Sequence, residues 1–134
     1  MLLAIILLAG CSTFRGGDSF KIDAPRDKAE LYGAYNDAVN RLGMTHKGGT
    51  VKVRFAPGDT MSNARPWMGR TNPNFEGVAL GLWVPSERAI LLYTTGGRWR
   101  YETARWEFGR AILWSRGTRE RAEQERRMID AGFR

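Results

Sequence analysis

A stretch of fourteen residues, 101–114, constrains the fold more than any other part of this chain. Apolar and small side chains recur along it at the spacing of one face of an α-helix. These are Ala104, Phe108, Ala111, Ile112 and Ser115. We therefore expect a helix that buries one stripe against a hydrophobic core.

A second face of this helix is unusual, because it places two large aromatic side chains beside an acid and a base. It carries Thr103, Trp106, Glu107, Arg110 and Trp114. The face opposite a buried stripe is ordinarily polar and solvated. This second face is therefore the first candidate for a functional site.

The preceding chain supplies elements that can pack against such a helix. Residues 26–42 carry apolar side chains at helical period, and residues 50–56 alternate between apolar and basic side chains as a half-buried strand does. Two apolar runs, 78–84 and 89–93, flank a short turn and predict a hairpin. Residues 119–130 carry opposite charges at helical spacing and predict a short surface helix.

These elements predict an α+β fold. We expect a small mixed or antiparallel sheet of about three strands, packed against the N-terminal helix and helix 101–114, with a short C-terminal helix. The length of 134 residues suits one domain. Residues 59–76 show no clean period and predict a long loop, which holds Trp67 and is a second candidate binding surface.

The chain begins with an uninterrupted apolar run that ends in Leu-Ala-Gly-Cys at residues 8–11. This pattern resembles a bacterial lipoprotein signal, whose small residues precede a cysteine that receives lipid. The run is shorter than the roughly 20 residues of a membrane-spanning helix and suits a signal peptide. The resemblance divides the chain into a signal at 1–10, the lipidated Cys11 with a tether to residue 23, and a domain at 24–134.

Two features of this N-terminus leave an alternative open. No Lys or Arg precedes the apolar run, and the run is short, so Met1 need not be the true start. The alternative is a buried N-terminal strand or helix with an incidental cysteine. Ser12 resembles the residue that directs lipoproteins to the outer membrane. The resemblance thus implies a lipid-anchored protein of the bacterial envelope, facing the periplasm.

Residues 102–113 also resemble the active-site helix of the zincin group of zinc metallopeptidases, whose core is H-E-x-x-H. Trp106 and Arg110 stand at the two histidine positions, and Glu107 stands at that of the general base. The predicted order of helix, strands and helix is similar to the upper part of such peptidases. The resemblance implies that strand 89–93 forms the rim of a cleft beside the helix.

The chemistry of these residues does not favour zinc. Zinc needs electron-pair donors, whereas an indole has none to offer and a guanidinium is always charged. The chain has one histidine, His46, and a single histidine cannot replace the missing pair. We expect no metal or other cofactor. Arg110 could place its own charge near Glu107, or the two could form an ordinary surface pair while Trp106 and Trp114 pack under the long loop.

Charge and aromatic content indicate the kind of partner. The formal net charge is +7 and the isoelectric point about 10.2, which suits an anionic surface or polymer. Tryptophans could line a groove for an extended peptide, a glycan or another envelope protein. They are Trp67, Trp83, Trp99, Trp106 and Trp114. The expected partners are membrane lipid, attached through Cys11, and one further partner. That partner is an envelope protein, a peptide or an anionic cell-wall polymer. An export signal argues against nucleic acid.

Two other functions compete with an inactive, metallopeptidase-like binding module. One is an active envelope hydrolase, a peptidase or a cell-wall enzyme, that uses Glu107 as a catalytic group. The other is a phage-encoded membrane or structural lipoprotein. The sequence offers no serine–histidine–aspartate set or phosphate-binding loop to suggest a different reaction.

Overall fold

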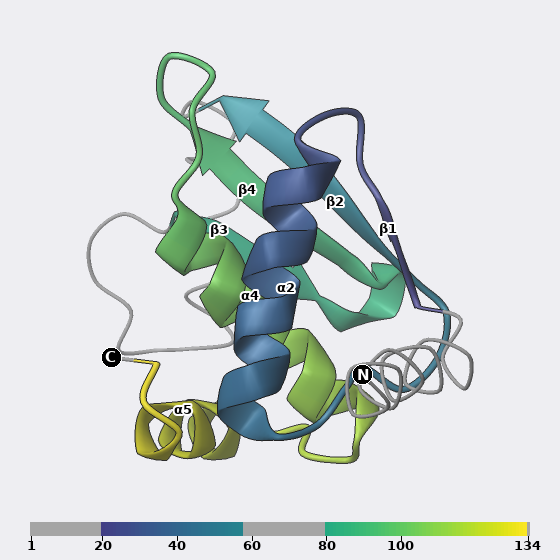
Figure 1. Ribbon diagram of the computed structural model, residues 1–134, viewed down its shortest axis with the longest axis vertical. Coiled ribbons are helices and arrows are strands. Elements are labelled where there is room, and N and C mark those ends of the chain that lie inside the picture. The colour runs from purple at the N-terminus through teal and green to yellow at the C-terminus, as the bar shows by residue number, and fades with distance from the viewer. Residues whose placement is uncertain (1–19, 58–79, 134) are drawn as a thin grey trace, which may run out of the picture.

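The computed structural model describes residues 20–57 and 80–133 and has the predicted α+β class. Its helices are α2 (Lys28–Leu42), α4 (Tyr101–Ser115) and α5 (Arg121–Asp130). Its strands are β1 (Lys21–Asp23), β2 (Thr50–Pro57), β3 (Gly81–Val84) and β4 (Ala89–Thr94). Helices α2 and α4 lie against the same face of the sheet, and α5 lies near one end of α2 (Figure 1).

The described strands form a mixed sheet in the order β1-β2-β4-β3. Strands β1, β2 and β4 are parallel, whereas β3 pairs with β4 in the predicted antiparallel hairpin. The hairpin turn is a short 3₁₀-helix, η1 (Pro85–Glu87), followed by Arg88 in the left-handed region at φ 51°. A non-glycine residue in this region carries a steric cost.

The sheet is mixed, as expected, and it differs from the sequence-based expectations in two details. The sheet has four strands rather than about three, because β1 lies within the segment 11–23 that was expected to be a tether. Three residues with one buried side chain, Ile22, are too short to give a periodic signal. Strand β4 does not form the rim of a cleft, because it pairs with β2 on one side and with β3 on the other. The edge strand next to it in the described sheet is β3.

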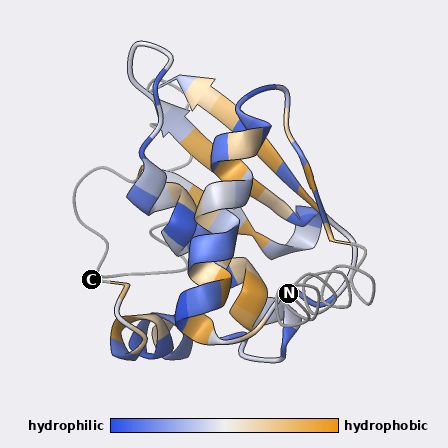
Figure 2. Cartoon of the chain, in the orientation of Figure 1, coloured by the Kyte–Doolittle hydropathy of each residue, from blue (hydrophilic) through white to orange (hydrophobic). Residues whose placement is uncertain are grey.

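The core lies between the sheet and the two long helices. The predicted stripe of α4 is buried at Ala104, Phe108, Ala111 and Ile112, while Ser115 is half-buried. Strands β2 and β4 face it with fully buried side chains, each worth about 1.5–3 kcal/mol of transfer free energy. These are Val51, Val53, Ile90 and Leu92. Figure 2 shows hydrophobic residues concentrated on these strands and hydrophilic residues on the outer side of α2.

Helix α5 approaches α4 closely at Gly109. A Cβ atom at this position would lie 2.6 Å from Met128 Sδ and 2.9 Å from Phe133 Cε2. Met128 and Phe133 are both buried in the common core. The absence of a side chain at Gly109 thus allows the C-terminal segment to pack against α4.

We expect Gly109→Ala to lower the free energy of unfolding by about 1–3 kcal/mol, because it overpacks the contact between α4 and α5. Gly33→Ala in α2 is the matched control, since its added Cβ would meet only Tyr101 at ordinary contact distances of 3.8 and 3.9 Å. The control should be neutral or stabilising by up to about 1 kcal/mol, as alanine favours helix over glycine. Urea unfolding measures both, and equal effects would contradict the close approach.

Candidate functional site

Arg110 is buried on the unusual face of α4 and connects it to α5. The residue is 4% exposed, and its guanidinium donates from Nη1 to Gln124 Oε1 at 3.2 Å and to the Arg121 carbonyl at 3.4 Å. Its Nη2 forms a salt bridge of 3.4 Å with Glu125 Oε2. These acceptors all belong to α5, so this side chain is a cross-link between two helices.

Trp106 supports the same junction. Its ring meets the Phe133 ring edge-on at 6.2 Å, and the Arg110 guanidinium lies 5.5 Å from its centre. The two residues at the histidine positions of the resembled motif therefore pack the C-terminal segment onto α4.

Glu107 lies beside β3 and is also buried, at 6% exposure. A Cβ added at Gly81 would be 3.2 Å from its Cγ. Oε1 of this carboxyl has no hydrogen-bond partner among the described residues. The hydroxyl of buried Tyr93 likewise has none there. Within the described residues, one carboxylate oxygen of Glu107 and the Tyr93 hydroxyl thus have no hydrogen-bond partner.

The surroundings of Glu107 favour its neutral form. Burial raises the pKa of the Glu107 carboxyl, while the charges of Arg110 and Arg121 and a backbone hydrogen bond from Trp83 oppose the rise. The pKa of Tyr93 is raised by burial and by the negative charge of Glu107. A buried acid with a raised pKa is a recognised mark of a functional site, although structural networks produce it too.

The expected relation between Glu107 and Arg110 needs correction. No salt bridge joins them in the described structure, because Arg110 pairs with Glu125 instead. They are not an ordinary surface pair either, since both are buried. The charge of Arg110 reaches Glu107 only as a longer-range effect on its pKa.

These side chains do not fit a zinc site. Arg110 brings a positive charge whose Nη1 and Nη2 donors are engaged by α5, and Trp106 offers no electron pair. His46 lies apart from them in the loop after α2, where its backbone N–H donates to the Tyr35 hydroxyl at 2.9 Å. Within residues 20–57 and 80–133, no three His, Cys, Asp or Glu side chains group together as metal ligands.

The tryptophans of the expected groove occupy three separate environments. Trp99 donates from Nε1 to Asp27 Oδ2 at 2.9 Å and so joins the start of α4 to the start of α2. Trp106 packs on Phe133, whereas Trp83 and Trp114 pack on each other with ring centres 6.3 Å apart. Trp67 and Cys11 lie outside the described residues.

Trp83 and Trp114 share a pocket of about 370 Å³, which we call the indole pocket. It lies where the loop after α2, the β3–β4 turn and the end of α4 meet. Its lining consists of His46, Lys47, Gly48, Trp83, Arg88, Trp114, Ser115 and Arg119. The volume falls in the range of small-ligand sites.

The indole pocket is positively charged. Its lining contains Lys47, Arg88 and Arg119 and no acidic residue. The Arg119 guanidinium lies 4.2 Å from the centre of the Trp114 ring. The sequence singled out Trp83 and Trp114 as possible groove residues but did not indicate the cations beside them. Lys47 and Arg88 belong to turns far apart in sequence, and a turn carries no periodic signal.

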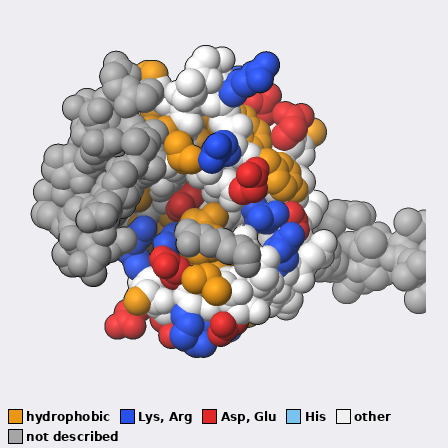
Figure 3. Space-filling view, turned by 90° about the vertical axis from the view of Figure 1, so that its left-hand side faces the viewer, with side chains coloured by type: hydrophobic (Ala, Val, Ile, Leu, Met, Phe, Trp, Pro, Cys, Tyr) orange, Lys and Arg blue, Asp and Glu red, His pale blue; other side chains and the backbone are white. Residues whose placement is uncertain are grey.

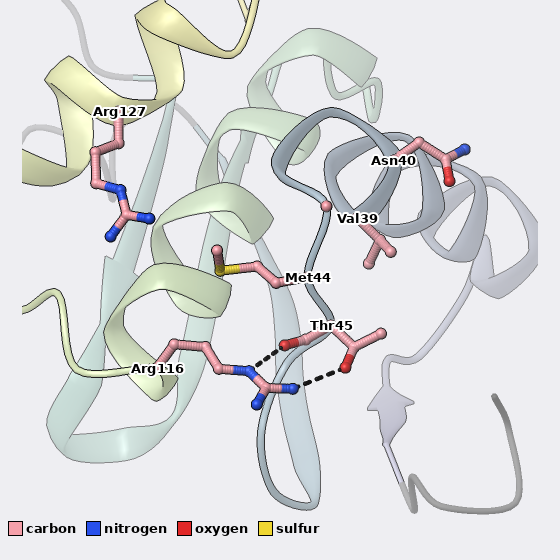
Figure 4. Close-up of a pocket in the computed structure, with 7 residues that line it drawn as sticks. Val39, Asn40, Met44, Thr45, Arg116 and Arg127 are labelled. Atoms are coloured by element: carbon pink, nitrogen blue, oxygen red, sulfur yellow. Dashed lines mark hydrogen bonds between the residues drawn. The ribbon is translucent and has the colours of Figure 1, made fainter.

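A second cavity, of about 670 Å³, lies between the end of α2 and the junction of α4 with α5 (Figure 4). Its two arginines already serve the fold. Arg116 donates from Nε to the Thr45 carbonyl at 2.9 Å and from Nη2 to Thr45 Oγ1 at 3.0 Å. Arg127 donates from Nη1 to Thr118 Oγ1 at 2.8 Å. This cavity is larger than the indole pocket, but its polar groups are largely engaged.

Several charged side chains elsewhere on the described domain form salt bridges. Arg41 and Arg105 both pair with Asp37, and Arg126 pairs with Glu123 and Asp130. On the face shown in Figure 3, basic and acidic side chains lie interspersed among hydrophobic ones. The three cations of the indole pocket, by contrast, form no salt bridge within the described residues.

Comparisons with protein-family models, curated proteins and solved structures give no match. In the part of the chain that the structure describes, no helix has both the length and the apolar content needed to cross a membrane.

We expect stability to fall as pH rises through the titration of Glu107. The folded state raises its pKa above the ordinary value of 4.5. The contribution of the neutral carboxyl to the free energy of unfolding is therefore fully present below that value. It is lost as pH rises through the pKa of the folded state. Urea unfolding between about pH 4 and pH 8 should show this loss in the wild type and a flatter profile for Glu107→Gln.

Glu102→Gln is the control for this measurement, because Glu102 is an exposed residue in the first turn of the same helix. It should keep the wild-type pH profile. A flatter profile for both variants, or for neither, would contradict the role given to the buried carboxyl.

Proposed function

We propose that this chain is a lipid-anchored envelope protein whose domain acts as a binding module rather than as a metallopeptidase. The observation that carries the proposal is the buried Arg110, which stands at a metal-ligand position of the resembled helix and is bonded to α5. A charged guanidinium at that position repels a metal cation. On this interpretation the former catalytic helix has become a structural platform.

The indole pocket supports a binding role for this platform. It lies at the C-terminal end of α4 and combines two tryptophans with cations drawn from three separate segments. Aromatic walls with a few convergent polar groups are typical of ligand sites. Trp83 also connects the two regions, because its backbone bonds to Glu107 while its indole lines the pocket.

The location in the envelope rests on the N-terminal sequence. Small residues before Cys11 fit the requirements of lipoprotein processing, and the cysteine sulfur would carry the lipid. Several acyl chains on one residue make membrane attachment stable. Ser12 favours the outer membrane as the destination.

Anchoring is tested with the full chain expressed in a Gram-negative host that is fed labelled palmitate. We expect label on the wild type and on Ser12→Ala, with both in the membrane fraction, and no label on Cys11→Ser. Cys11→Ser that still incorporated palmitate would show that this cysteine is not the lipidated residue.

Loss of the metal site is tested by elemental analysis of the purified full chain after incubation with zinc. We expect far less than one bound zinc per chain, because neither Trp106 nor Arg110 is a ligand. Stoichiometric zinc that survived dialysis would overturn the proposed exchange of ligands.

An envelope hydrolase that uses Glu107 is the second candidate function. It is favoured by the raised pKa of this buried carboxyl and by its unpartnered Oε1. Under that function, Glu107→Gln would lower the turnover of a peptidoglycan or protein substrate by about 10²–10⁴-fold. Under the binding function, the wild type and Glu107→Gln should both show no turnover above background, as measured by product release.

A further inference from the structure

The described domain begins beside the indole pocket. The Phe20 ring stacks on the Tyr35 ring at 4.0 Å and lies 5.4 Å from the ring of His46, which lines the pocket. Nine positions separate Phe20 from Cys11. Nine residues can span at most about 30 Å, even when fully extended. Lipid on Cys11 would therefore keep the pocket within about that distance of the membrane.

The positive charge of the pocket is available to a partner. Lys47, Arg88 and Arg119 are exposed, and none of them forms a salt bridge within the described residues. Each comes from a different segment, so the fold gathers them at one place. Near an anionic membrane, each such cation contributes favourable binding free energy that falls off within a Debye length.

Trp114 adds a group that suits a membrane surface. Trp83 is 1% exposed and packs against the Trp114 ring with ring centres 6.3 Å apart. Trp114 is half-buried and presents an aromatic ring beside Arg119. Tryptophan is enriched where protein meets lipid headgroups, because its ring is apolar and its N–H is polar.

We propose that the indole pocket binds the phosphate of an anionic phospholipid in the membrane that anchors the chain. Phosphate oxygens would accept from the Lys47 ammonium and from the Arg88 and Arg119 guanidinium groups. The domain would then lie with this end against the leaflet instead of rotating on its tether. The inference rests on the proposed lipid anchor at Cys11, which brings the pocket close to lipid rather than to a distant soluble polymer.

The experiment uses the mature, lipidated protein reconstituted in two kinds of vesicle. One is phosphatidylcholine alone, and the other is equal parts phosphatidylcholine and phosphatidylglycerol. Hydrogen exchange followed by mass spectrometry reports the protection of each segment. We expect exchange in peptides covering residues 46–48, 86–89 and 115–119 to slow by about tenfold in the anionic vesicles. Peptides covering residues 95–100 should be unchanged.

A variant with Lys47→Gln, Arg88→Gln and Arg119→Gln should lose the difference between the two vesicles. The matched control carries Lys28→Gln, Arg98→Gln and Arg100→Gln, which remove the same charge at the other end of α4. The 15 residues of α4 separate the two ends by about 22 Å. The control should keep the tenfold difference. All six side chains are exposed, so both variants should fold, and Arg88→Gln alone should weaken the effect partially.

Three results would overturn the proposal. The first is equal protection in the two vesicles. If the mass of the N-terminal peptide includes lipid, this result refutes phosphate binding by the pocket but leaves the anchor intact. The second is protection of the pocket by soluble polygalacturonate but not by phosphatidylglycerol, which would assign the site to an anionic polymer. The third is an N-terminal peptide without lipid, which would refute the anchor and the inference that rests on it.

Discussion

The buried charge of Arg110 is the constraint on which the C-terminal half of the domain depends. A guanidinium removed from water must be matched by acceptors, because an unpaired buried charge is very costly. Helix α5 supplies a side-chain amide, a backbone carbonyl and a carboxylate. Gly109, one residue earlier, lets Met128 and Phe133 approach closely enough for this arrangement. The position of α5 thus follows from two adjacent residues of α4, one charged and one without a side chain.

The charge of Arg110 is covalently part of the chain, and its partners on α5 fix the packing of a helix. It reaches Glu107 only as a longer-range effect on the pKa of that carboxyl. Glu107 keeps a raised pKa even with this charge nearby, because burial outweighs the attraction.

Local periodicity was enough to predict α2, α4, the alternating strand β2 and the β3–β4 hairpin. It could not reveal β1, whose three residues hold one buried side chain, nor the parallel pairing of β1, β2 and β4. Parallel pairing joins segments far apart in sequence and leaves no local mark. The burial of Arg110 was hidden for a related reason, since its acceptors are 11 to 15 residues away on another helix. The indole pocket was hidden because its cations come from separate turns.

The hairpin turn illustrates how this chain balances stability against charge. Arg88 has a backbone conformation, φ 51°, that glycine adopts without cost and that disfavours any residue with a Cβ. The same residue projects its guanidinium to the wall of the indole pocket. A glycine would relax the turn and remove one of three cations, so folding and electrostatic attraction make opposite demands on this one position. The backbone strain at the tip of the hairpin is the conformational cost of holding a positive charge where the sheet meets the pocket.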